Sequence, residues 1–73
     1  MNHNQTYRLG PHEYDPVFSR DLSERGVRTG GYRHCQMEGC RGLRIGIRWP
    51  DGRISWPCTM SLAEGPSGGW KII

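Results

Sequence analysis

Three cysteines and one histidine are the residues of this chain whose types and spacing favour metal chemistry. His34 and Cys35 are adjacent, Cys40 follows in the same segment, and Cys58 lies in the second half of the sequence. Thiolate and imidazole groups are the donors with which proteins hold zinc in a tetrahedral site. The interval from Cys35 to Cys40 is longer than in a usual zinc-binding pair, and the second half of the chain supplies one thiol instead of two.

The same cysteines also have a plain structural interpretation. Cys58 alternates with Trp56 and Met60 in a pattern that directs it to the interior, where cysteine behaves as a small apolar residue. Cys35 and Cys40 are then unpaired thiols. An odd number of cysteines fits a disulfide framework poorly and a reducing compartment well. We therefore predict no cofactor, and the alternative is a zinc site whose ligands are His34, Cys35, Cys40 and Cys58.

The chain lacks the residue patterns that are typical of enzymes. Cys35 and His34 are neighbours, and neighbouring side chains on a strand point to opposite faces. The glycine pairs at 30–31 and 68–69 lack the following helix and the basic anchor of a phosphate-binding loop. We therefore expect a protein that acts by binding and not by catalysis.

The size and composition of the chain indicate one small, loop-rich domain. The sequence has 73 residues, of which 34% are hydrophobic, with eleven glycines and five prolines. No segment approaches the run of about 18 apolar residues that a membrane span requires, so we expect no membrane association. We predict a flexible N-terminal arm over residues 1–12, a folded domain over 13–64 and a C-terminal tail over 65–73. The tail either adds a strand or binds a partner.

A short helix is predicted over residues 16–25. Asp15 is a suitable N-cap, and Pro16 at the first helical position loses no hydrogen bond. Phe18 and Leu22 are four residues apart and would share one face, and Gly26 offers a left-handed stop. A helix of this length is only marginally stable by itself, and we therefore expect its apolar face to pack on another element.

The strongest pattern predicts an antiparallel hairpin. Apolar residues occupy the odd positions of 43–49 and the even positions of 54–62, and Pro50 to Arg53 between them favour a turn. Pairing Trp49 with Ile54 places Ile47 opposite Trp56 and makes one face wholly apolar, whereas pairing Trp49 with Arg53 mixes the faces. We predict the first register. The predicted fold class is α+β, a small single domain with one short helix packed on an antiparallel β-hairpin or three-stranded sheet.

The outer face of this hairpin is the predicted partner-binding surface. Nine of the ten basic residues are arginines, and the net charge is +3. Arginine keeps its charge and makes forked hydrogen bonds, and with tryptophan it is enriched at binding hot spots. The predicted contact residues are Arg44, Arg48, Arg53 and Trp70. A solvated charged face and direct binding of nucleic acid are the alternatives.

A resemblance gives this binding surface a partner. Taken from Met1 to Ile73, with its 32–35 segment Tyr-Arg-His-Cys and its 49–52 turn Trp-Pro-Asp-Gly, the chain resembles the small regulators with which lytic bacteriophages bind host RNA polymerase. The resemblance implies binding to the N-terminal region of the β′ subunit near the RNA exit channel, with the β flap and NusA as further contacts. It implies displacement of the sigma factor at initiation, and antitermination together with NusA.

The remaining expectations concern the state of the protein. We expect a monomer in the cytoplasm of the host bacterium that meets nucleic acid only indirectly, through the polymerase. The family offers no short motif, so the resemblance assigns no functional residue.

Overall fold

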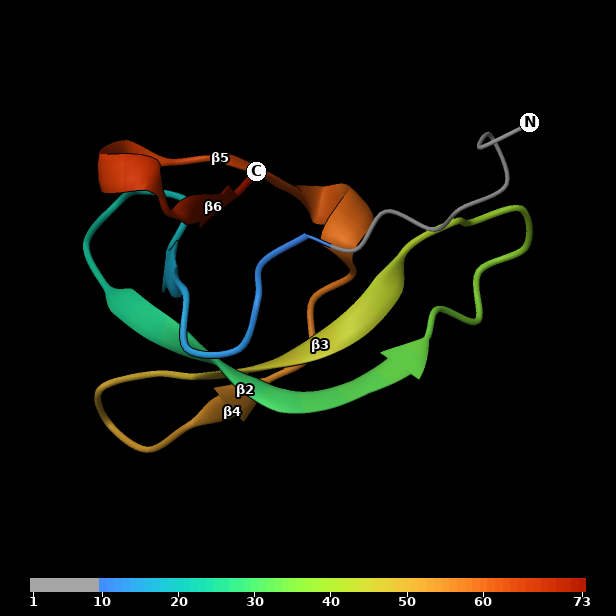
Figure 1. Ribbon diagram of the computed structural model, residues 1–73, viewed down its shortest axis with the longest axis horizontal. Helices are drawn as coiled ribbons and strands as arrows, with labels where there is room; N and C mark the ends of the chain where they lie inside the picture. The colour runs from blue at the N-terminus through green and yellow to red at the C-terminus, as the bar shows by residue number, and fades with distance from the viewer. Residues whose placement is uncertain (1–9) are drawn as a thin grey trace.

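The computed structural model describes residues 10–73, which form a mixed β-sheet of six strands in the order β4-β3-β2-β1-β6-β5 (Figure 1). The strands are β1 (Pro16–Phe18), β2 (Arg25–His34), β3 (Leu43–Arg48), β4 (Ile54–Ser55), β5 (Leu62–Glu64) and β6 (Trp70–Ile72). Two short 3-10 turns, η1 (Thr59–Ser61) and η2 (Pro66–Gly68), flank β5. β1 and β6 run parallel, and the other neighbours are antiparallel.

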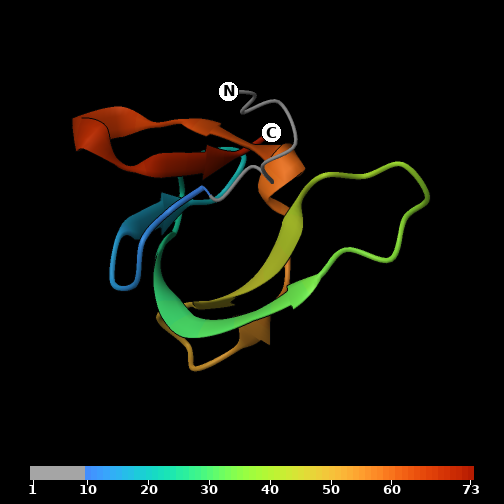
Figure 2. The same cartoon turned by 45° about the vertical axis from the view of Figure 1, so that its right-hand side comes forward.

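The sheet curves strongly, and its core fills the concave side. Figures 1 and 2 show the β5–β6 hairpin facing the bend of β2 and β3. The odd positions of β3 point inward, as the alternation predicted, and meet one residue each from β1 and β5. The buried apolar residues are Val17, Leu43, Ile45, Ile47, Trp49 and Leu62. Three segments distant in the sequence therefore share one small core.

The predicted helix over 16–25, and with it the α+β fold class, is wrong. These residues form β1, a turn and the beginning of β2, and the helical segments of the described chain are three-residue 3-10 turns. Val17 is fully buried, and β1 is hydrogen-bonded to β2 on one side and to β6 on the other. Leu22 has a left-handed φ of 65° inside the turn, which a helix excludes. Tertiary pairing has overridden a helix that was marginal alone.

The predicted hairpin is present, but its register differs by one residue. Ile47 pairs with Ser55 and Arg48 with Ile54, so Trp56 does not face Ile47. The turn explains the shift: Trp49 donates its amide to Arg53 at 2.9 Å across a three-residue loop, and Gly52 at the end of that loop has φ 89°. A three-residue loop that ends in a left-handed glycine is a common hairpin connection. Turn geometry has therefore decided the register against the hydrophobic pattern.

The two ends of the chain were predicted as an arm and a tail. Residues 1–9 of the arm lie outside the described residues, and Pro11 is buried. Residues 65–73 contain η2 and β6, in which Trp70 and Ile72 pack against the core. Within residues 10–73, no helix has the length and apolar composition needed to cross a membrane.

Candidate functional site

The outward face of β2, β3 and β4 carries a mixed basic and aromatic surface. We call it the arginine-tryptophan face, and it consists of Arg33, Arg44, Arg48, Ile54 and Trp56. The observed register creates it, because Ile54 lies opposite Arg48 and Trp56 is turned to the same side. Ile54 is 46% exposed, and Trp56 is half-buried.

Two glycines make room for the indole ring of Trp56. A Cβ atom on Gly46 of β3 would lie 3.3 Å from the Cη2 atom of Trp56, and one on Gly31 of β2 would lie 3.4 Å from it. The ring therefore lies directly against the backbone of both strands. Glycine inside a strand often marks such a close approach. The ring is thereby held as a rigid part of the surface.

Two arginines contact Trp56, and a third lies on the same face. The guanidinium carbon of Arg33 lies 4.4 Å from the centroid of the Trp56 ring, within the range of a cation–π interaction. Arg44 lies opposite Arg33 across the strands, and its Nη1 donates to the carbonyl of Trp56 at 3.0 Å. Arg48 is exposed on the same side of β3. None of the three makes an ion pair with a residue of the described chain, so their charges are available to a partner.

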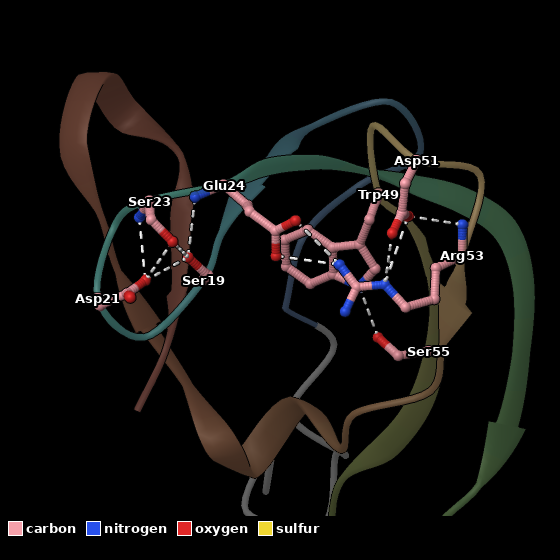
Figure 3. A network of polar contacts seen from close by, with 8 residues as sticks. All are labelled: Ser19, Asp21, Ser23, Glu24, Trp49, Asp51, Arg53 and Ser55. Carbon is pink, nitrogen blue, oxygen red and sulfur yellow. Dashed lines mark hydrogen bonds and ion pairs between the residues drawn. The ribbon is translucent and has the colours of Figure 1, made fainter.

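The structure places Arg53, a predicted contact residue, on the other side of the hairpin. Its guanidinium carbon lies 5.7 Å from the centroid of Trp49, and its Nη2 donates to both carboxylate oxygens of Glu24 at 3.0 Å (Figure 3). Its Nε also lies 3.3 Å from Asp51. The hydrogen bond to Glu24 is the main reason that the pKa of Arg53 is raised. The structure thus separates Arg53 from Arg44 and Arg48.

Trp70, the fourth predicted contact residue, lies in β6. It pairs with Val17 of β1 on one side and with Glu64 of β5 on the other. The side chain is half-buried and packs against the core. It therefore faces the core, whereas Arg48 lies exposed on the outward side of β3.

Sequence reasoning missed Arg33 and Trp56. Arg33 lies in a segment without clear periodicity, because the pairing of β2 with β3 shifts register between Arg28 and Tyr32. Trp56 was assigned to the core by the incorrect hairpin register. A signal was present: Gly46 interrupts the outward row of β3 between two arginines, and such a gap in a strand indicates a large side chain from elsewhere.

Comparison with known protein families, curated proteins and solved structures finds no match to this chain. Its function must therefore be inferred from its residues and their arrangement.

A second candidate site is a cluster of three thiols. Cys35 follows β2, Cys40 lies in the loop between β2 and β3, and Cys58 immediately precedes η1. Their Sγ atoms all lie within 4.8 Å of one another, and those of Cys40 and Cys58 are 3.5 Å apart. Figure 2 shows this loop projecting beyond the end of the sheet. Gly42 is buried against Cys58, where any side chain would overlap the sulfur atom.

The thiols have different electrostatic surroundings. A hydrogen bond from the backbone amide of Met37 is the main reason that the pKa of Cys35 is lowered, and the positive charge of Arg44 adds to this effect. Burial is the main reason that the pKa of Cys58 is raised. Cys58 is half-buried and belongs to this cluster, not to the apolar core.

His34 is not part of the thiol cluster. It pairs with Leu43, so it lies on the opposite face of β2 from Cys35. There it makes an edge-on contact with Tyr32, with ring centroids 6.5 Å apart, and lines a cavity of about 380 Å³. Of the four predicted zinc ligands, the structure therefore brings together the three cysteines and leaves out the histidine.

Proposed function

We propose that this chain is a bacteriophage transcription regulator that binds bacterial RNA polymerase through its arginine-tryptophan face. The observation that carries the proposal is a set of three arginines on one face, without ion-pair partners among residues 10–73, of which Arg33 lies over the ring of Trp56 and Arg44 donates to its carbonyl. Arginine and tryptophan are the residue types most enriched among those that dominate binding energy at protein interfaces. Because the Trp56 ring is already fixed by Gly31 and Gly46, little side-chain entropy is lost when a partner covers it.

The partner follows from charge and from the resemblance to phage regulators. A basic face whose arginines have no ion-pair partners among residues 10–73 is complementary to an acidic protein surface. This charge complementarity raises the rate at which the two proteins associate. The N-terminal region of the β′ subunit near the RNA exit channel is the docking site that the resemblance implies, with the β flap and NusA nearby. Occupation of that site would oppose sigma-dependent initiation and, together with NusA, favour antitermination. The protein would act in the cytoplasm of the host.

A protein partner is favoured over nucleic acid by the distribution of charge. Nucleic-acid binding sites carry a broad basic stripe that neutralises many phosphates. Here the net charge is +3, and the face carries three arginines, one of which lies over the Trp56 ring. A salt series separates the two classes, because nucleic-acid affinity falls steeply and log-linearly with salt concentration.

The test is direct binding to purified bacterial RNA polymerase, with and without NusA. The double variant Arg33→Ser/Arg48→Ser removes two charges from the arginine-tryptophan face. At about 1 kcal/mol or more for each contact, we expect a loss of affinity of at least about thirtyfold. The control is Arg20→Ser/Arg25→Ser, which removes the same charge at exposed positions near the β1–β2 turn.

The outcomes separate the parts of the proposal. Equal loss in both double variants would indicate an effect of net charge alone, and unchanged binding of the Arg33/Arg48 variant would refute the assigned surface. Arg53→Ser tests the sequence-based prediction separately, because that residue lies on the other side of the hairpin. No binding of the wild-type chain to polymerase, to its β′ N-terminal region or to NusA would refute the function itself.

A further inference from the structure

We propose that Cys35, Cys40 and Cys58 form a zinc-binding site that shares no residue with the arginine-tryptophan face. The three residues come from the end of β2, from the β2–β3 loop and from the position before η1. Their sulfur atoms nevertheless meet within 4.8 Å of one another. Soft thiolates favour Zn²⁺, which prefers a tetrahedral arrangement of such donors.

The dimensions of the cluster fit this ion. With Zn–S bonds of about 2.3 Å, two sulfurs of a tetrahedral site are separated by about 3.8 Å. The Cys40 and Cys58 sulfurs are 3.5 Å apart, and the third lies within 4.8 Å of each. A disulfide would require a distance of about 2.0 Å and would leave one of the three thiols over.

The surrounding backbone donates hydrogen bonds to two of the three sulfurs. The sulfur of Cys40 accepts the amide of Gly42 at 3.3 Å, and that of Cys58 accepts the amide of Met60 at 3.5 Å. In both cases the donor is two residues further along the chain, so one local turn is repeated at the two positions. Such outer hydrogen bonds orient ligands and stabilise their charge in metal sites.

Among residues 10–73, no further histidine, cysteine or carboxylate joins the cluster, so the three thiols would fill three of the four positions around the ion. The ion would tie the β2–β3 loop to η1, where the apolar core does not reach.

The experiment uses the full chain, reduced and freed of metal, and titrates it with zinc and separately with cobalt. We expect one metal ion for each chain by native mass spectrometry, a higher thermal midpoint with zinc, and the near-ultraviolet charge-transfer absorption of cobalt bound to thiolates. The midpoint rises because the ion binds the folded chain and not the unfolded one. These measurements require no substitution, so they test the proposal even where a variant fails to fold.

Variants then identify the ligands. Cys35→Ser, Cys40→Ser and Cys58→Ser should each lower zinc affinity by more than the roughly 10- to 100-fold that loss of an outer partner costs. His34→Ala is the control and should bind zinc as the wild type does. Failure of the reduced wild-type chain to take up zinc or cobalt would overturn the proposal. Equal zinc affinity in the wild type and a cysteine variant would overturn the assignment of that ligand.

Discussion

Replacing Trp49 by alanine is expected to remove a large part of the stability of this protein. The Trp49 side chain is 5% exposed and belongs to the core. Truncation of a buried tryptophan costs about 3–5 kcal/mol, because apolar contact is lost and a cavity is left. At roughly 0.05–0.15 kcal/mol per residue, a chain of 73 residues has a free energy of unfolding of about 4–11 kcal/mol. The variant should therefore be partly unfolded or have a much lower urea midpoint.

Trp56→Ala is the matched comparison, because it removes the same side chain from the opposite face of the hairpin. Trp56 is half-buried against Gly31 and Gly46 and encloses no space that would become a cavity. The loss is then limited to the transfer of apolar surface, about 2 kcal/mol or less. Ser55→Ala provides a smaller reference: it removes the acceptor of the 2.8 Å hydrogen bond from the indole nitrogen of Trp49 and should cost about 1–3 kcal/mol.

The assay is urea unfolding followed by far-ultraviolet circular dichroism, which does not depend on the tryptophan that has been removed. Trp49→Ala must be clearly less stable than Trp56→Ala. If Trp56→Ala were as destabilising as Trp49→Ala, the Trp56 ring would belong to the core. The hairpin would then have the register in which Ile47 faces Trp56, and the arginine-tryptophan face would not exist.

Three further outcomes follow from single residues. Thr59→Val should lower the free energy of unfolding in urea by about 1–3 kcal/mol, because the buried Thr59 hydroxyl accepts a hydrogen bond from the amide of Leu43 at 3.0 Å. Thr59→Ser keeps this acceptor, and an equal loss of stability in both variants would contradict the reason given. Gly46→Ala should cost about 1–3 kcal/mol and weaken nuclear Overhauser contacts between Trp56 and Arg33, because the added methyl lies 2.5 Å from Thr29; an unchanged spectrum would contradict the packing. Hydrogen bonds, of which that from the side chain of Ser23 is the largest cause, lower the pKa of Asp21 from 3.8 to about 2. The contribution of the Asp21 carboxylate to the stability of the folded state is therefore complete above pH 3.8 and is lost as the pH falls toward 2. Carboxyl titration by NMR checks that value, Asp21→Asn should remove this part of the acid dependence, and an ordinary pKa would refute the turn geometry.

The sequence alone determined strand β3 and its buried side. The alternation from Leu43 to Trp49 predicted β3, and its odd positions are buried as expected. A turn after this strand was predicted over residues 50–53, but the loop contains only residues 50–52, so its place was right and its length was wrong. These features depend on local periodicity and local turn chemistry, which a single segment contains in full.

The partners of each segment were decided by the tertiary structure. Residues 16–18 carry helix-start signals, and pairing with β2 and β6 selects a strand instead. The hairpin register depended on a loop of three residues, which moved Trp56 from the predicted core to the outer face. Periodicity says which side of a strand is apolar, but it does not say which strand lies beside it.

The same distinction applies to the candidate sites. The residue types were visible in the sequence, as arginines on an alternating strand and as cysteines in three separate segments. Only the fold placed Arg33 over Trp56, moved Arg53 to Glu24, and joined Cys58 to Cys35 and Cys40 while leaving His34 on the other face. Such sites depend on contacts between residues far apart in the chain, which composition and spacing do not specify.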